Sequence, residues 1–131
     1  MSVINPGSVT LSTWRDIYQG GKASLDPSCL DAVARSAAFV AQIAAKDQAV
    51  YGINTGFGLL ASIGIAPEDL QTLQRNLVIS HAAGLGEPMP RSVVRLMMAL
   101  KLTSLGRGAS GVRVETIQFL ERLLDLDLLP V

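Results

Sequence analysis

Four stretches of this 131-residue chain repeat apolar side chains at a spacing of three and four residues. That spacing places the side chains on one face of an α-helix, where a neighbouring element can bury them. The stretches are residues 30–44, 70–81, 93–105 and 114–124. The sequence therefore predicts a mainly α chain with short extended segments and one glycine-rich, irregular loop over residues 51–65.

Helix starts and stops are marked by short polar and glycine signals. Asp26-Pro27 is typical of a helix start, because the carboxylate can accept a free backbone N–H and proline has no N–H to lose. Ser12 is predicted to cap a brief helix that Gly20 ends, with extended residues on either side, at 9–11 and 23–25. On the 93–105 helix, Arg95 lies off the apolar stripe.

Composition limits the partners and the compartment. The formal net charge is zero, which argues against nucleic acid and anionic membranes as partners. Cys29 is the single cysteine, and with one histidine it rules out a structural zinc site and an internal disulfide. The uncharged run over 49–67 is broken by glycines and is not a membrane span. The first residues lack the apolar run of a signal peptide, which predicts a cytoplasmic protein.

The balance of apolar and charged residues does not suit a free-standing domain. Apolar residues make up 49% of the chain and charged residues 17%. A surface so short of charge leaves apolar patches exposed, and such patches usually mark contacts with other chains or with absent parts of the same chain.

The glycine-rich loop opens with residues 51–58, Tyr-Gly-Ile-Asn-Thr-Gly-Phe-Gly. Glycine adopts backbone angles that other residues avoid, and it lets a ligand approach the main chain closely. A tyrosine at the head of such a loop suits an acid or base held on a mobile lid. The same composition is also typical of a tight turn after a strand, with Tyr51 as a half-buried aromatic side chain.

Three ordered blocks resemble the aromatic amino acid ammonia-lyases. The first is the 51–58 stretch. The second, residues 73–84 (Leu-Gln-Arg-Asn-Leu-Val-Ile-Ser-His-Ala-Ala-Gly), is similar to the histidine ammonia-lyase version. The third is residues 105–113, Leu-Gly-Arg-Gly-Ala-Ser-Gly-Val-Arg. The resemblance extends from about Leu11 to Val131 and so covers nearly the whole chain.

The resemblance implies a fold, an activity and a prosthetic group. Residues 1–131 would be a single N-terminal segment of the ammonia-lyase helical fold, without the catalytic tripeptide region and the central helix bundle. The family member would eliminate ammonia from L-histidine to give trans-urocanate, as a homotetramer with no external cofactor. Its electrophile would be a methylidene-imidazolone ring formed from an internal Ala-Ser-Gly tripeptide expected beyond Val131. The 131-residue chain alone is then expected to be inactive.

The same resemblance assigns roles to four residues. Tyr51 matches the family's catalytic acid/base, although a free phenol has a pKa near 10 and is almost wholly protonated at pH 7. His81 matches the residue that faces a histidine substrate. Asn54 and Gly58 are assigned to the substrate-binding loop.

Other motifs are weaker. Ala109-Ser110-Gly111 has the sequence of the cyclising tripeptide, but its flanks match the segment before that tripeptide, and a helix break explains it. Residues 56–61 fit a dinucleotide fingerprint, yet no acidic residue follows about 20 positions on, where Val78 lies. Ser80 and His81 are not expected to form a nucleophile and its base, because neighbouring helical side chains point about 100° apart.

Two alternatives remain open. One is a sister enzyme, a phenylalanine or tyrosine ammonia-lyase or an aminomutase of the same family. The other is a non-catalytic helical fragment whose apolar face binds a partner.

Overall fold

A computed structural model describes residues 2–46, 49–56, 58 and 62–130. The expected mainly α fold with short extended segments is confirmed. The sequence favours an end of the 30–44 helix at Lys46-Asp47-Gln48, and of these residues Asp47 and Gln48 lie outside the described ones, as does most of the loop between 57 and 61. The elements in chain order are β1 (Ser2–Ile4), α1 (Leu11–Tyr18), β2 (Ala23–Leu25), the short 3-10 helix η1 (Pro27–Cys29), α2 (Leu30–Ala44), the 3-10 helix η3 (Pro67–Asp69), α3 (Leu70–His81), α4 (Arg91–Gly106) and α5 (Val114–Asp125).

The chain forms two compact units. Unit 1 comprises Met1–Ala38 and Glu87–Val131, and unit 2 comprises Phe39–Gly86. Helix α2 begins in unit 1 and ends in unit 2. The prediction that residues 1–131 are a single segment of a longer lyase concerns that longer protein and stays a prediction.

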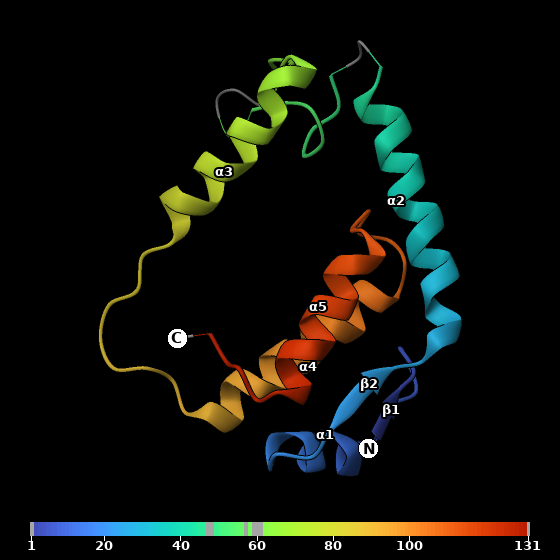
Figure 1. Cartoon of the computed structure of the whole chain (residues 1–131), viewed down its shortest axis with the longest axis vertical. Helices are drawn as coiled ribbons and strands as arrows, with labels where there is room; N and C mark the ends of the chain where they lie inside the picture. The colour runs from blue at the N-terminus through green and yellow to red at the C-terminus, as the bar shows by residue number, and fades with distance from the viewer. Residues whose placement is uncertain (1, 47–48, 57, 59–61, 131) are drawn as a thin grey trace. The chain divides into compact units, whose positions relative to one another are not determined.

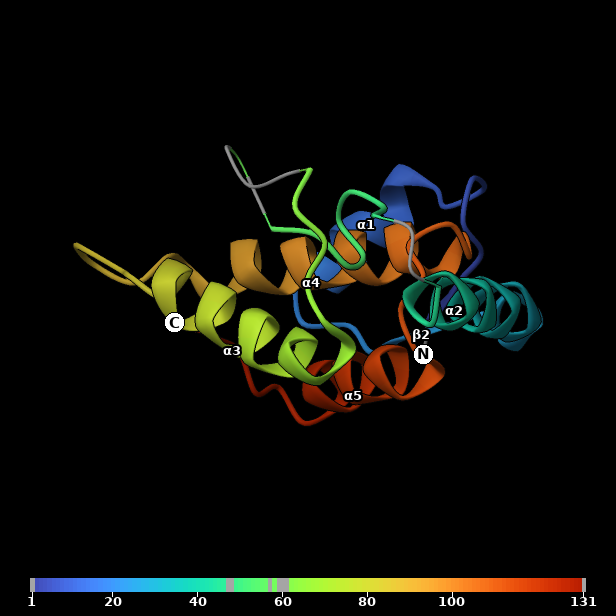
Figure 2. The same cartoon turned by 90° about the horizontal axis from the view of Figure 1, so that it is seen from above.

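Unit 1 is built on an antiparallel pair of helices. Helices α4 and α5 pack side by side, α1 packs on α4, and strand β2 contacts both helices (Figure 1; Figure 2). Strands β1 and β2 pair in parallel, with Ser2 opposite Ala23 and Ile4 opposite Leu25. Apolar side chains from both helices, from α1 and α2 and from the strands meet in one core. Its buried members are Ile4, Ile17, Ala23, Leu25, Val33, Met98, Ala99, Leu102, Leu105, Ile117 and Leu124.

Of two helix starts predicted from the sequence, the structure confirms one and shifts the other. Asp26 accepts a hydrogen bond from the Ser28 N–H at 2.9 Å, as expected, although the first turn is the 3-10 helix η1. Helix α1 starts earlier than predicted, because Thr10 and not Ser12 accepts the N–H of Thr13, at 3.3 Å. Leu11 is therefore helical, and the extended piece predicted over residues 9–11 is wrong at that residue.

Glycine is required where the connection after α4 passes α2. Gly108 has a φ of +69°, and a Cβ built there would lie 2.7 Å from the Cβ of Ala32 and 2.8 Å from its carbonyl carbon. Such a side chain would be strained both by its backbone angle and by the backbone of α2. Gly108 therefore allows the chain to turn from α4 towards α5 in contact with α2.

Large apolar side chains remain exposed on both units, as the composition predicts. Phe39 is 62% exposed on α2, Val78 is 67% exposed on α3, and Phe119 is 65% exposed on α5. Among the helices that the structure describes, none combines the length and the apolar character needed to cross a bilayer.

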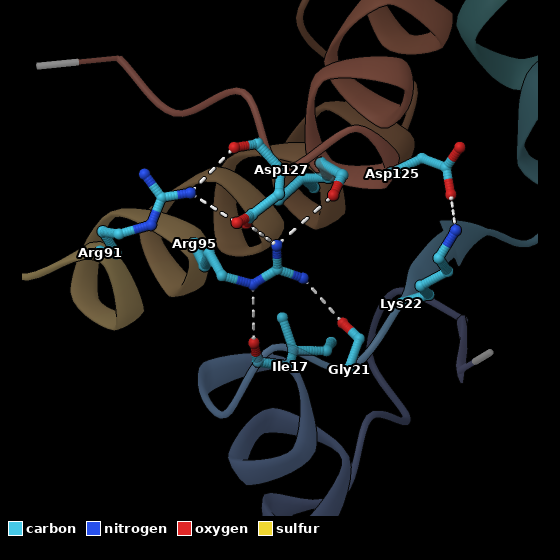
Figure 3. A network of polar contacts seen from close by, with 8 residues as sticks. Ile17, Gly21, Lys22, Arg91, Arg95, Asp125 and Asp127 are labelled. Carbon is cyan, nitrogen blue, oxygen red and sulfur yellow. Dashed lines mark hydrogen bonds and ion pairs between the residues drawn. The ribbon is translucent and has the colours of Figure 1, made fainter.

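A buried arginine organises one end of unit 1. The apolar stripe of α4 leaves Arg95 outside the predicted buried face, yet its side chain is only 7% exposed. Its guanidinium donates to the carbonyl oxygens of Ile17 at 3.3 Å, Gly21 at 2.9 Å and Leu124 at 3.4 Å, and it pairs with Asp127 (Figure 3). Ile17 and Leu124 lie in the last turns of α1 and α5, where the helix dipole gives the carbonyls partial negative charge. The N–H groups of Gly20 and Asp127 also donate to these two carbonyls, at 3.1 and 3.3 Å. The apolar pattern of α4 could not predict the burial of Arg95, because the partners of this side chain come from distant parts of the sequence.

Asp127 completes the network just after α5. Its φ is +55°, a left-handed angle that glycine usually supplies at a helix end but that aspartate tolerates. The Leu128 N–H reaches back to the Leu123 carbonyl at 2.9 Å, which closes the helix end. Arg91 donates to the Asp127 carbonyl at 3.0 Å and also pairs with its carboxylate. Alongside, Lys22 pairs with Asp125 at 2.7 Å.

We expect Arg95→Met to lower the free energy of unfolding by about 3 kcal/mol, because the substitution removes three hydrogen bonds to carbonyl oxygens and the ion pair with Asp127. The matched control is Lys101→Met, an exposed position on the same helix, which should change it by less than about 0.5 kcal/mol. Urea denaturation followed by circular dichroism measures both. Equal midpoints for the two variants would show that the Arg95 network does not stabilise unit 1.

The Asp127 carboxylate should make stability depend on pH in acid. Hydrogen bonds from Arg91 and then from Arg95 hold its pKa below the ordinary value. The unfolded chain therefore takes up the proton at a higher pH than the folded chain, so the stabilisation is complete above about pH 5 and is lost as pH falls through the folded pKa. We expect the stability difference between the unchanged chain and Asp127→Asn to shrink from pH 6 to pH 2. A difference that stays constant over this range would contradict the assignment.

Candidate functional site

The loop of unit 2 that carries Tyr51 starts as a tight turn. The N–H groups of Ile53 and Asn54 both point to the Val50 carbonyl, at 3.1 and 3.2 Å. The Asn54 Oδ1 atom accepts the Val50 N–H at 2.7 Å, so Asn54 closes the turn with its main chain and its side chain. Gly52 supplies the left-handed angle inside the turn, with a φ of +79°. Tyr51 lies between these bonds and is 65% exposed, more than the half-buried side chain of the alternative interpretation.

A second set of backbone bonds fastens the turn to the segment before α3. The Asn54 carbonyl accepts the Ile65 N–H at 2.8 Å, and the Gly56 N–H donates to the Ile63 carbonyl at 3.2 Å. Between them, Thr55 forms an antiparallel bridge with Gly64. Residues 54–56 and 63–65 thus form a short antiparallel pairing, which we call the clasp, and Tyr51 lies in the turn just before it.

The side chains of Asn54 and Thr55 are buried in this clasp. Asn54 is 6% exposed and Thr55 is 1% exposed, whereas Tyr51 points outward. The Thr55 hydroxyl donates to the Gly56 carbonyl at 3.0 Å. A pocket of about 240 Å³ lies beside Asn54 and is lined mainly by the end of α2 and by residues 64–67. Neither Tyr51 nor His81 lines it.

Gly58 is exposed and has a φ of +59°. Its neighbours Phe57 and Leu59 lie outside the described residues, so its assignment to the substrate-binding loop stays a prediction. Residues 59–61 of the loop also lie outside the described residues, and so does most of the dinucleotide fingerprint over 56–61.

His81 is the last residue of α3 and is exposed. Its Nδ1 atom lies 2.8 Å from the Leu77 carbonyl oxygen. Because a carbonyl can only accept, Nδ1 carries a proton in this contact, and in the neutral ring Nε2 is then an acceptor. The side chain is thereby held in one orientation at the carboxyl end of the helix.

Ser80 and His81 lie closer than their helical spacing predicts. The Ser80 Oγ atom is 3.1 Å from His81 Nδ1, so the expectation that the two side chains do not face each other is wrong. Both fold back onto the same Leu77 carbonyl, to which the Ser80 hydroxyl donates at 2.9 Å. An Nδ1 that carries a proton cannot accept one from serine, and this geometry does not make a nucleophile and base.

The structure joins some of the predicted site residues and separates others. Tyr51 and Asn54 share one turn. His81 lies at the far end of α3 from the point where the loop enters it (Figure 1). A helix of twelve residues is about 18 Å long, so the length of α3 separates His81 from the loop that precedes the helix.

Comparison with known proteins decides the family. A family model described as "Aromatic amino acid lyase" matches residues 9–131, almost the whole chain. The chain belongs to the aromatic amino acid lyase family.

Solved structures of lyases and aminomutases share this fold. A histidine ammonia-lyase from Trypanosoma cruzi is 31% identical, with a TM-score of 0.81 over 94% of this chain and 24% of its own. An ergothionase from Treponema denticola is 21% identical, with a TM-score of 0.90 over 98% of this chain and 26% of its own. The tyrosine aminomutase of Streptomyces globisporus is 24% identical, with a TM-score of 0.86 over 94% of this chain and 24% of its own. The chain thus spans about a quarter of the length of these proteins.

The Ala-Ser-Gly tripeptide of this lyase-family chain lies between α4 and α5. Gly108 and Gly111 both have a φ of +69°, and they flank exposed Ala109 and Ser110. The Gly111 N–H, the atom that would have to attack the Ala109 carbonyl during cyclisation, donates instead to the Ser36 hydroxyl at 3.0 Å. The geometry of these residues fits the predicted helix break, and the assignment of the methylidene-imidazolone precursor to another Ala-Ser-Gly tripeptide stays a prediction.

The described part of the chain contains no group of side chains that could hold a metal ion. Within residues 2–46, 49–56, 58 and 62–130, no three His, Cys, Asp or Glu side chains gather as metal ligands would. Cys29 is partly buried, and desolvation raises the pKa of its thiol, which suits a packing role.

Sequence reasoning missed the partner of the loop. Gly64 and Ile65 hold Thr55 and Asn54 in place, but the sequence offers only the alternation of Ile63, Gly64 and Ile65 as a strand-like signal. Three residues are too few to separate a bridge from an irregular segment.

We expect Gly52→Ala to loosen the turn that carries Tyr51, because a side chain at a φ of +79° costs about 1 kcal/mol. Amide exchange at Asn54 and Ile65 should then become about fivefold faster, as measured by nuclear magnetic resonance. The control is Gly64→Ala, since Gly64 has open space around it and lies outside the left-handed region. Equal exchange rates in the two variants would contradict the strained turn.

Proposed function

We propose that this chain acts as part of a carbon–nitrogen lyase that eliminates ammonia from L-histidine to give trans-urocanate. Family membership and the 31% identical histidine ammonia-lyase support the proposal. The observation that carries it is His81, whose Nδ1 is bound to Leu77 and whose Nε2 is left as an acceptor. An acceptor nitrogen at an exposed helix end suits the N–H of a substrate imidazole ring.

In this proposal Tyr51 is the catalytic acid/base. The turn holds its backbone on both sides, and its phenol extends outward, where a substrate can meet it. The groups that would take up or supply the proton with it lie in the whole enzyme. We assign the electrophile to a methylidene-imidazolone ring formed outside residues 1–131, which would activate the substrate for loss of ammonia.

The proposed assembly is a cytoplasmic homotetramer. The exposed apolar side chains of unit 1 and unit 2, such as Phe119 and Phe39, support burial against further protein. The partners are L-histidine and further copies of the lyase.

A second candidate is a phenylalanine or tyrosine ammonia-lyase, or an aminomutase of the same family. The TM-score of 0.86 with a tyrosine aminomutase supports the shared fold and leaves the substrate open. A non-catalytic helical fragment is the third candidate, and a defined complex of the 131-residue chain with a partner in ultracentrifugation would favour it.

We expect His81→Leu, made in a full-length lyase that contains this chain, to lower kcat/KM for L-histidine at least about tenfold, because an apolar side chain cannot pair with the imidazole. The matched control is Thr72→Ala, an exposed residue of α3, which should leave kcat/KM unchanged. Absorbance of urocanate measures the rate.

Two further measurements complete this test. Tyr51→Phe should lower kcat about a hundredfold or more, as loss of a positioned acid/base does. The 131-residue chain alone should form no urocanate. Turnover of L-tyrosine or L-phenylalanine but not L-histidine would select the sister enzymes, and no turnover of any of the three would reject the lyase proposal.

A further inference from the structure

We propose that Asn54 is a positioning residue that sets the orientation of Tyr51, and that it does not contact the substrate. This replaces the substrate-binding role that resemblance assigns to Asn54. Its catalytic consequence rests on the proposed function, in which Tyr51 is the acid/base.

Burial is the first argument. Asn54 is 6% exposed, whereas Tyr51, three residues earlier, is 65% exposed. A side chain that binds substrate must present a polar atom to the space that substrate enters. Although Asn54 lines the 240 Å³ pocket, its amide is engaged by the main chain, with Oδ1 accepting the Val50 N–H at 2.7 Å and Nδ2 donating to the Lys46 carbonyl at 3.5 Å.

The chemistry of the two contacts explains why the residue is asparagine. One partner is a donor and the other is an acceptor, and a short side chain must serve both from the same place. The amide group offers an acceptor and a donor on one planar end, whereas an ionised aspartate only accepts and leucine does neither. The amide has one orientation that satisfies both partners, so the contacts hold the side chain as well as the turn.

The position of Tyr51 follows from these contacts. Tyr51 is bonded to Val50 on one side and to Gly52 on the other, and the Val50 main chain is held at both its N–H and its carbonyl by Asn54. The Asn54 carbonyl in turn accepts Ile65, which ties the turn to the segment before α3. Asn54 therefore connects the backbone of Tyr51 to the chain that follows α2 and to the chain that precedes α3.

The loop of unit 2 depends on the hydrogen bonds of this clasp for its conformation. All the buried apolar side chains of the described residues belong to unit 1, and within the described part of unit 2 the buried side chains are those of Asn54 and Thr55. With little apolar burial to order the loop, hydrogen bonds of the clasp carry its geometry. Loss of the Asn54 contacts should change the turn locally and leave the core of unit 1 intact.

The first experiment uses the 131-residue chain and amide hydrogen exchange. Asn54→Leu keeps the approximate volume but removes both polar atoms, and it should speed exchange of the Val50 amide about tenfold. Asn54→Asp keeps an acceptor opposite Val50 and should stay within about threefold of the unchanged chain. Thr55→Val is the matched control, because its hydroxyl bonds to Gly56 and does not reach Val50.

Protection of the amides in α4 shows that each variant is still folded. Unchanged Val50 exchange in Asn54→Leu, or equal acceleration in Thr55→Val, would overturn the positioning role. Faster Val50 exchange in Asn54→Leu alone would support it.

The second experiment uses the full-length lyase and separates positioning from substrate contact. A residue that acts through Tyr51 should change proton transfer and not affinity, so Asn54→Leu should lower kcat about tenfold or more with KM within about twofold. The same substitution should cause no further loss in a Tyr51→Phe background, because the group that Asn54 orients is already gone.

A raised KM with unchanged kcat, or losses that multiply in the double variant, would overturn the proposal and return Asn54 to the substrate. A full-length protein that turns over none of the aromatic amino acids would reject the proposed function. In that case the exchange experiment alone decides whether Asn54 holds the turn, so the two failures are distinguishable.

Discussion

The buried guanidinium of Arg95 is the interaction on which unit 1 depends most directly. A charge so little exposed is tolerated only where partners surround it, and Arg95 finds them in carbonyls of the last turns of α1 and α5, in the turn at Gly21 and in Asp127. Those partners come from two separate parts of the chain, residues 17–21 and 124–127. Satisfying one side chain therefore places both helix ends beside α4 (Figure 3). Ile17 and Leu124, whose carbonyls bind Arg95, are also members of the apolar core.

Unit 2 is ordered by a different kind of interaction. Its loop relies on the amide of Asn54, the hydroxyl of Thr55 and a few backbone bonds, while large apolar residues such as Val78 stay exposed. The residues with proposed chemistry, Tyr51 and His81, both lie in this unit. Unit 1 contains the apolar core, and unit 2 presents the residues with proposed chemistry on a loop held by hydrogen bonds.

Local signals predicted most of the helices, because apolar stripes and caps act within a few residues of each other. Asp26 capped as expected, and the helix break expected at Ala109-Ser110-Gly111 lies between α4 and α5. The errors came from competing local options or from distant partners. Thr10 took the cap expected of Ser12, and the burial of Arg95 could not be found from the stripe of α4 alone. The parallel pairing of residues 2–4 with residues 23–25 was not predicted, because it joins segments about twenty residues apart.

The sequence by itself determined the helical pattern, the glycine-rich loop and the family, since each is written in residue spacing or in an ordered motif. Only the tertiary structure decided what the polar side chains do. Asn54 reads as a loop residue, and only its burial against Val50 and Lys46 shows that it holds the turn of Tyr51. Helical spacing separates Ser80 from His81, yet both fold back onto the Leu77 carbonyl. The reason is physical: a hydrogen bond depends on the position and direction of two groups, and spacing along the chain specifies neither.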